Sequence, residues 1–106
     1  MIINLTQADW NKEVVESDIP VLVEFWAPWC GHCTSLAPTI KEIAHDYDGQ
    51  IKVCMVNIDE EPALTANCGV MSIPACIRYE NGDKKWKTLG AYSKADLLSQ
   101  LGFDVK

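Results

Sequence analysis

The sequence predicts an α/β fold in which helices flank both faces of a central mixed β-sheet. Two observations lead to this prediction. Apolar segments with strand character alternate with segments of helical spacing, in the order β-α-β-α-β-α-β-β-α. The last two strands flank Asn81-Gly82, a typical hairpin turn, so they run antiparallel, whereas right-handed crossovers make the earlier strands parallel. The length of 106 residues predicts one domain spanning residues 1–106.

The N-terminal part begins with a short strand, expected over residues 2–5. Thr6 followed by Asp9 resembles a capping box, which predicts a helix that continues to about residue 17. Residues 21–27 are apolar at nearly every position, as expected for a central strand that is covered on both faces.

A long helix is expected over about residues 30–47, where apolar residues recur at helical spacing. It should end near Gly49, which can adopt a positive φ. Pro38 lies inside this helix and removes one backbone hydrogen bond, which predicts a kink.

The remaining elements are a strand, a short helix, the two hairpin strands and a final helix. They are expected over residues 51–58, 60–68, 75–80 and 84–89, and from Ser93 onward. Ser93 together with Asp96 has the spacing of a helix cap.

The charge and cysteine content narrow the possible functions. A formal net charge of -6 argues against nucleic acid or an anionic membrane as a partner. No apolar stretch approaches the ~20 residues that span a bilayer, and residues 1–6 show no signal-peptide pattern. Five cysteines exclude a fully paired disulfide framework in a monomer. We therefore expect a cytoplasmic monomer in a reducing environment.

The segment Cys30-Gly31-His32-Cys33 joins the apolar strand to the long helix. A thiol at a helix start lies beside unpaired N–H groups and the positive end of the helix dipole, which favour the nucleophilic thiolate. The second thiol is close enough to close a small ring and expel whatever the first has attacked. The spacing predicts a dithiol redox site that needs no bound cofactor.

A structural metal half-site is the alternative for the same two cysteines. The further ligands would come from a scattered set, Cys54, Cys68, Cys76, His32 and His45. No second CxxC or HxxxH spacing is present, so the redox interpretation is favoured and no metal is expected. A cluster shared between two chains stays open.

Several motifs at matching spacing resemble the thioredoxin family over essentially the whole chain. They are Phe25-Trp26-Ala27-Pro28-Trp29-Cys30-Gly31-His32-Cys33, Pro38, Asn57-Ile58-Asp59 and Ile73-Pro74. The resemblance implies the thioredoxin fold and the activity of a protein-disulfide oxidoreductase. It also implies disulfide-containing substrate proteins and an NADPH-dependent flavoprotein, thioredoxin reductase, as partners.

The resemblance assigns roles to matching positions. Cys30 is implied to be the exposed attacking thiol and Cys33 the buried resolving thiol. Ile73-Pro74 matches the place of a cis peptide that faces the disulfide. The substrate-binding surface is implied to comprise Trp29, Gly31, Ile73, Pro74, Gly90 and Ala91.

Departures from the family pattern lie close to the cysteines. His32 stands where a typical thioredoxin has proline, and Cys-Gly-His-Cys resembles the site of protein disulfide isomerases. Gly31 and His32 are therefore expected to tune the pair. We predict a reduction potential above the roughly -270 mV of ordinary thioredoxin, shifted toward the roughly -180 mV of the isomerase.

A second departure concerns the acid that is expected to take the proton of Cys33. Glu24 stands where the family usually has aspartate, and Met55 replaces a lysine that many relatives carry near that acid. Burial should raise the pKa of Glu24 toward neutrality, which suits proton transfer.

Three functions remain in competition at this point. A thioredoxin-type disulfide reductase is favoured, and His32 keeps a disulfide isomerase or oxidase open. The third is a non-catalytic docking subunit with the same fold, against which the intact cysteine pair weighs.

Overall fold

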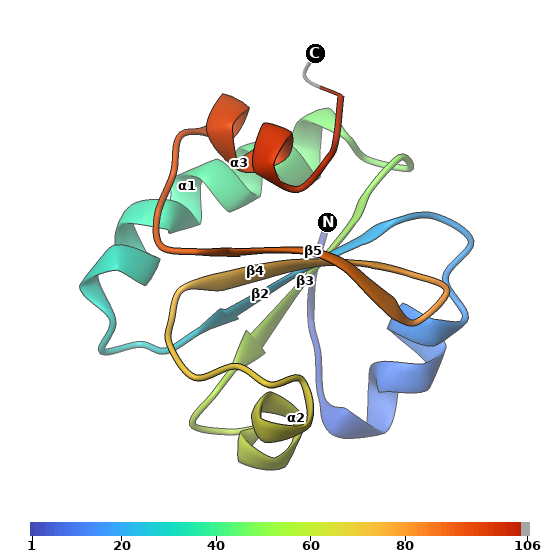
Figure 1. The fold of residues 1–106 in the computed structure, drawn as a ribbon, viewed down its shortest axis with the longest axis vertical. Coiled ribbons are helices and arrows are strands. Elements are labelled where there is room, and N and C mark those ends of the chain that lie inside the picture. Colours follow the sequence, from blue (N-terminus) through green and yellow to red (C-terminus); the bar gives the residue numbers. More distant parts are fainter. Residues whose placement is uncertain (105–106) are drawn as a thin grey trace.

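The computed structural model describes residues 1–104, so residues 105–106 of the predicted domain lie outside the described part. A five-stranded sheet forms the middle layer, with strand order β1-β3-β2-β4-β5. Helices α1 and α3 cover one face, whereas α2 and the N-terminal helical segments cover the other (Figure 1). The strands are β1 (Ile2–Asn4), β2 (Val21–Trp26), β3 (Lys52–Asn57), β4 (Ala75–Glu80) and β5 (Asp83–Leu89). The α-helices are α1 (Gly31–Asp46), α2 (Pro62–Asn67) and α3 (Lys94–Gln100).

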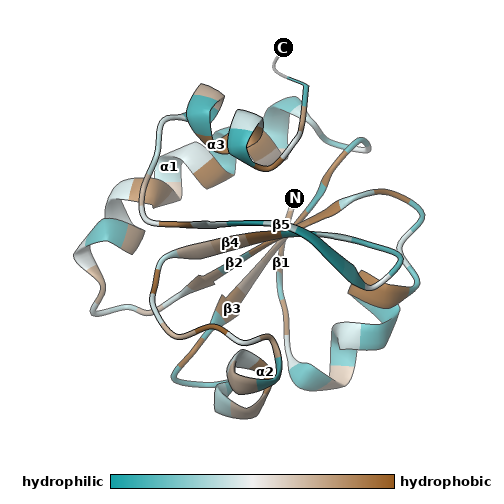
Figure 2. Ribbon diagram, viewed as in Figure 1, coloured by the Kyte–Doolittle hydropathy of each residue, from teal (hydrophilic) through white to brown (hydrophobic). Residues whose placement is uncertain are grey.

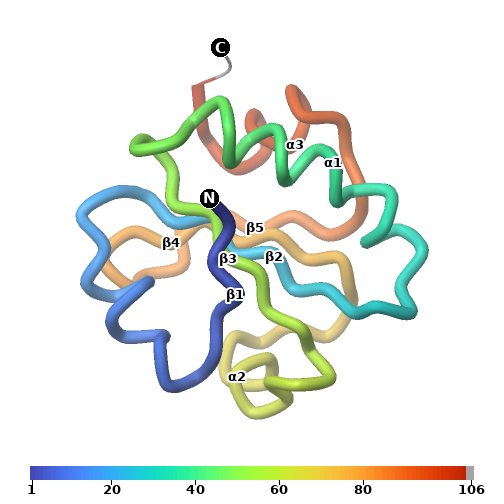
Figure 3. Tube along the Cα trace, turned by 180° about the vertical axis from the view of Figure 1, so that it is seen from behind, coloured from blue at the N-terminus to red at the C-terminus, as the bar shows by residue number. Residues whose placement is uncertain are grey.

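The sheet is mixed, as predicted. Strands β1 and β2 both pair with β3 in parallel, whereas β4 pairs antiparallel with β2 and with β5. Seen from behind, the tube in Figure 3 follows the crossovers that carry the chain between the parallel strands. Strand β2 therefore lies at the centre of the sheet, which confirms the prediction of a strand covered on both faces.

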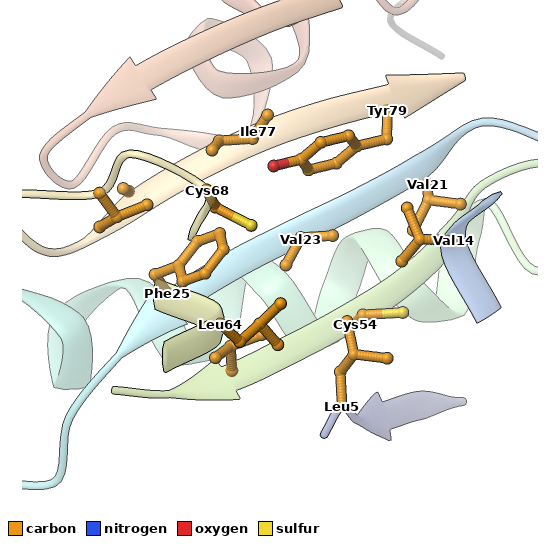
Figure 4. Packing of buried hydrophobic residues seen from close by; sticks show 13 residues of the cluster. Leu5, Val14, Val21, Val23, Phe25, Cys54, Leu64, Cys68, Ile77 and Tyr79 are labelled. Carbon is orange, nitrogen blue, oxygen red and sulfur yellow. The ribbon is translucent and has the colours of Figure 1, made fainter. Parts of the chain in front are cut away.

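Two apolar cores lie on opposite faces of this central strand because successive side chains of a strand point to opposite sides. Val21, Val23 and Phe25 pack toward α2 and the N-terminal segment (Figure 4). Leu22 packs into the second core beneath α1 and α3. In Figure 2 the inner strands carry mostly brown, apolar residues, the edge strand β5 is largely teal, and the helices alternate between brown and teal.

The predicted α-helix between residues 6 and 17 is wrong. The structure has a 3₁₀ turn, η1 (Gln7–Asp9), followed by a π-helical segment, η2 (Asn11–Val15). Thr6 donates its hydroxyl hydrogen bond to the Asp9 carboxylate at 2.9 Å, so it does not cap a backbone N–H.

Two side chains of this segment pack onto the sheet, at a four-residue spacing that an α-helix would also allow. Trp10, at the junction of η1 and η2, packs edge-on against Tyr79 with 5.0 Å between the ring centroids. Val14 is fully buried in the same core. The Glu16 N–H donates to the Asn11 carbonyl at 2.9 Å, five residues back, so the segment closes with a π-type bond where an α-helix would bond four residues back.

Most other element predictions are confirmed to within two residues. Gly49 has a φ of +79°, and the hairpin turn places Asn81 and Gly82 at φ values of 55° and 82°. Ser93 accepts a hydrogen bond from the Asp96 N–H at 3.2 Å and so caps α3. Pro38 lies inside α1, and the kink stays a prediction.

None of the helices within residues 1–104 has both the length and the apolar character needed to cross a membrane.

Candidate redox active site

Cys30 and Cys33 form a disulfide at the start of α1. Cys30 is the N-cap residue, and its Sγ accepts a hydrogen bond from the Cys33 N–H at 3.2 Å. The two Cα atoms are 5.2 Å apart. When the disulfide is reduced, the same N–H and the positive end of the α1 dipole can stabilise a thiolate at Cys30.

The structure makes Cys30 less exposed than the resemblance implied. Cys30 has 8% of its surface exposed and Cys33 has 3%, so both are buried and Cys30 is only slightly more accessible. The expectation of an exposed Cys30 is therefore wrong for the disulfide form. The reason is local packing, because the pair forms a small apolar cluster with Ala27 against Trp26 and Ile73.

The two residues inside the disulfide ring face solvent. Gly31 and His32 are both exposed in the first turn of α1. A Cβ placed on Gly31 would meet nothing within 4 Å, so no contact in the structure requires glycine there.

Glu24 is fully buried, as its predicted role requires. It lies opposite Met55 of β3 and Cys76 of β4, on the sheet face covered by α1. Neither carboxylate oxygen has a hydrogen-bond partner among the described residues. Burial raises the pKa of Glu24 from 4.5 to about 7.

Within residues 1–104, no hydrogen bond or ion pair from a lysine compensates this buried acid. The sequence predicted this loss, because Met55 replaces the lysine that many relatives carry. Lys52, on the same strand as Met55, instead pairs with Glu13 at 3.3 Å. Met55 and Lys52 are three positions apart in β3, so their side chains point to opposite faces.

A surface groove of about 340 Å³ lies close to the disulfide. Trp29 is 67% exposed and is held by its indole N–H, which donates to Asp59 Oδ2 at 2.9 Å. The Ile73-Pro74 peptide is cis. The groove is lined by Trp29, Ile58, Thr65, Val70, Met71, Ser72 and Ile73.

The remaining predicted surface residues, Gly31, Pro74, Gly90 and Ala91, are not among those that line this groove. Pro74 is buried, and its carbonyl accepts a hydrogen bond from the Gly90 N–H at 2.9 Å. Gly90 has a φ of 102°, and Ala91 is exposed beside it. The Gly90 backbone is thus bonded directly to the cis-proline.

Sequence reasoning missed several residues of the groove. Thr65, Val70, Met71 and Ser72 come from α2 and the segment that follows it. The available signal was that Met71 and Ser72 directly precede Ile73-Pro74.

The other three cysteines lie apart from the disulfide. Cys54, Cys68 and Cys76 are free thiols and are buried. Burial raises all three pKa values, that of Cys54 to about 12. Within residues 1–104, no three His, Cys, Asp or Glu side chains are grouped so that they could hold a metal ion.

The fold and a CXXC pair at a helix N-terminus define a dithiol–disulfide oxidoreductase. Comparison with known proteins gives the family, because the model of the thioredoxin family matches residues 1–102. The chain is 45% identical over 102 residues to thioredoxin from Rickettsia felis, covering 96% of this chain and 97% of that protein. It is 44% identical over 97 residues to thioredoxin 1 from Nostoc sp., covering 92% and 91%.

For one chloroplast relative, the match to this chain covers only part of that relative's length. Chloroplastic thioredoxin M5 from Oryza sativa subsp. japonica is 46% identical over 93 residues, covering 88% of this chain and 54% of that protein. The chain therefore belongs to the thioredoxin family, which confirms the predicted fold and oxidoreductase class. Membership implies disulfide-containing substrates and a reductase that recycles the pair.

Proposed function

We propose that this protein is a thioredoxin-type disulfide reductase in which Cys30 attacks and Cys33 resolves. The observation that supports this assignment most directly is the position of Cys30 Sγ. It accepts the Cys33 N–H at the start of a 16-residue helix, where a thiolate is stabilised. The adjoining groove exposes Trp29 and offers apolar contact to an extended substrate segment.

The reaction proceeds in two exchange steps. The Cys30 thiolate attacks one sulfur of a substrate disulfide, which breaks the substrate S–S bond and releases one substrate thiolate. The Cys33 thiolate then attacks Cys30 Sγ, forms the Cys30–Cys33 disulfide and releases the second substrate thiolate. Two electrons pass to the substrate, and its two thiolates take up two protons.

Glu24 is proposed to accept the proton of Cys33 directly or through water. Its burial, and the lack of a hydrogen-bond partner for it within residues 1–104, support this role, because both favour the protonated carboxyl. A pKa of about 7 suits a group that takes up and returns a proton near neutral pH.

His32 is proposed to raise the reduction potential by stabilising the Cys30 thiolate. Its support is its place inside the redox ring, exposed in the first turn of α1. An NADPH-dependent flavoprotein reductase is proposed to return the pair to the dithiol. Three buried free thiols suit a reducing compartment, and the cytoplasm is proposed.

The reductase assignment is tested by reduction of insulin disulfides with dithiothreitol as the electron source. Cys30→Ser should abolish the reaction, because the attacking sulfur is lost. Cys54→Ala is the matched control. It removes a thiol from the core that packs against α2 and the N-terminal segment, so it should leave the rate unchanged. An unchanged rate in Cys30→Ser would refute the assignment.

The tuning role of His32 is tested by equilibrating the pair with glutathione buffers. We expect a potential of about -200 mV or above for the wild type, and a fall toward about -270 mV in His32→Pro. A wild-type value near about -270 mV would show that His32 hardly tunes the pair.

A further inference from the structure

The sulfur atoms of this chain differ greatly in their access to solvent. Cys30 and Cys33 are joined in a disulfide, and the other three thiols are buried. Among the methionines, Met55 is partly buried, whereas Met1 is 84% exposed and Met71 is 97% exposed. Two thioethers are therefore open to a dissolved oxidant.

Met71 is the exposed thioether that lies in the substrate groove. It lines the groove together with Trp29 and Ile73, close to the redox pair. Trp29 is 67% exposed, so two large apolar side chains are presented to solvent in one groove. A flexible, polarisable thioether can adapt to apolar side chains of different shapes, which suits a surface that binds many substrates.

We propose that Met71 makes substrate docking sensitive to peroxide: oxidation of its thioether to the sulfoxide weakens binding of protein disulfides and leaves the Cys30–Cys33 chemistry intact. This inference rests on the proposed reductase function. The sulfur lone pair attacks one peroxide oxygen, the O–O bond breaks, and the leaving hydroxide takes the proton of the transferred oxygen and departs as water. The thioether loses the two electrons that the peroxide gains. The product carries a polar S=O group where an apolar contact is needed.

The structure explains why the thiols should be spared. Peroxide reacts with thiolates, and burial raises the pKa values of Cys54, Cys68 and Cys76. All three are also shielded within the cores. In the disulfide form, Cys30 and Cys33 offer no thiolate.

Met1 supplies an internal reference for the same reaction. Its amino group lies 4.0 Å from the Asp48 carboxylate, just beyond the C-terminal end of α1. The disulfide lies at the opposite end of that 16-residue helix, about 24 Å away at 1.5 Å per residue. Oxidation of Met1 should therefore leave docking unchanged.

The test begins with the disulfide form of the protein treated with hydrogen peroxide, with site occupancy measured by peptide mass spectrometry. Insulin is then compared with hydroxyethyl disulfide, a small polar substrate that does not need the groove. Oxidation of Met71 should raise the KM for insulin about tenfold, as expected for loss of an apolar contact. The kcat for insulin and the rate with hydroxyethyl disulfide should not change, and methionine sulfoxide reductases should restore the KM.

Three variants separate Met71 from the other methionines. Met71→Leu keeps an apolar side chain that peroxide cannot oxidise, so its KM should resist treatment. Met71→Gln should raise the KM without peroxide, because it places a polar group at the same point. Met1→Leu should respond to peroxide as the wild type does.

Two results would overturn the inference while leaving the reductase function standing. One is an unchanged insulin KM at full Met71 oxidation, and the other is an equal loss of activity toward both substrates. If the untreated protein reduces neither disulfide, the reductase function itself fails and the inference fails with it.

Discussion

Two carboxyl groups close to α1 occupy opposite surroundings. Glu24 lies on β2, two residues before the chain leaves that strand for the redox loop, and it is fully buried with no hydrogen-bond partner among the described residues. Asp46 lies in the last turn of α1, partly exposed, and binds the Lys94 ammonium group from α3. One acid, on the sheet face that α1 covers, thus has no hydrogen-bond partner within residues 1–104, whereas an acid of α1 itself is paired.

The pKa values of these two groups move in opposite directions. Burial raises the pKa of Glu24, whereas the hydrogen bond from Lys94 lowers the pKa of Asp46. A paired carboxylate anchors structure, but it holds its charge too firmly to exchange protons near neutral pH. The comparison indicates that the fold leaves an acid unpaired where proton transfer is proposed, and pairs an acid where two helices must be joined.

The largest expected effect on stability comes from replacing Glu24 by leucine. Because the folded-state pKa is about 7 and the ordinary value is 4.5, the folded protein binds this proton more tightly than the unfolded chain does. The resulting stabilisation is fully present below about pH 4.5 and is lost as the pH rises through about 7. At about 1.4 kcal/mol per pKa unit, the loss is about 3 kcal/mol. Glu24→Leu should recover about this much at pH values above 7.

Urea unfolding of the disulfide form at about pH 5 and about pH 8 measures this difference. The wild-type free energy of unfolding should fall relative to that of Glu24→Leu as the pH increases. Comparing the two proteins at each pH cancels the titration of all other groups. Parallel pH dependences would show that Glu24 does not titrate abnormally.

A second effect of Glu24 should appear in the rate of resolution. Glu24→Gln keeps the size of the side chain but cannot accept a proton. Attack by Cys33 on the mixed disulfide should slow about 10²-fold, the lower end for general base catalysis. Stopped-flow fluorescence of Trp29, which is exposed beside the disulfide, can follow this step. Met55→Leu is the control, because it changes a neighbour of Glu24 without removing the acid. A resolution rate in Glu24→Gln within about twofold of the wild-type rate would contradict the base role.

Local signals allowed much of the fold to be predicted. The apolar run of β2, the Asn81-Gly82 turn and the Ser93 cap each depend on a few neighbouring residues. The winding of the N-terminal segment was mispredicted because Trp10 and Val14 have the four-residue spacing of an α-helix, whereas the backbone closes with a five-residue bond from Glu16 to Asn11. Apolar spacing alone does not distinguish these two windings.

The same distinction applies to the site. The spacing of Cys30 and Cys33 is local, and Glu24 was conspicuous as the one acid in an apolar strand. The groove is not local, since α2 and the loop before Pro74 reach Trp29 only through the fold. The alignment of Glu24 with Cys76 also required the strand order and register.

The smallest expected effect comes from Lys94→Met at the other end of α1. The variant removes the ion pairs of Lys94 with Asp46 and Glu42, so Tm should fall slightly at neutral pH. Because the folded-state pKa of Asp46 is lowered, this stabilisation is present above the unfolded value of 3.8 and is lost as the pH falls through the lowered folded value. Thermal unfolding should therefore show a difference in Tm between Lys94→Met and the wild type at about pH 7. This difference should disappear in strong acid and shrink in high salt.

Insulin reduction by Lys94→Met should be unchanged, because the ion pair lies a helix length away from the disulfide. A loss of reductase activity in Lys94→Met would show instead that the anchored end of α1 controls the geometry of its redox end.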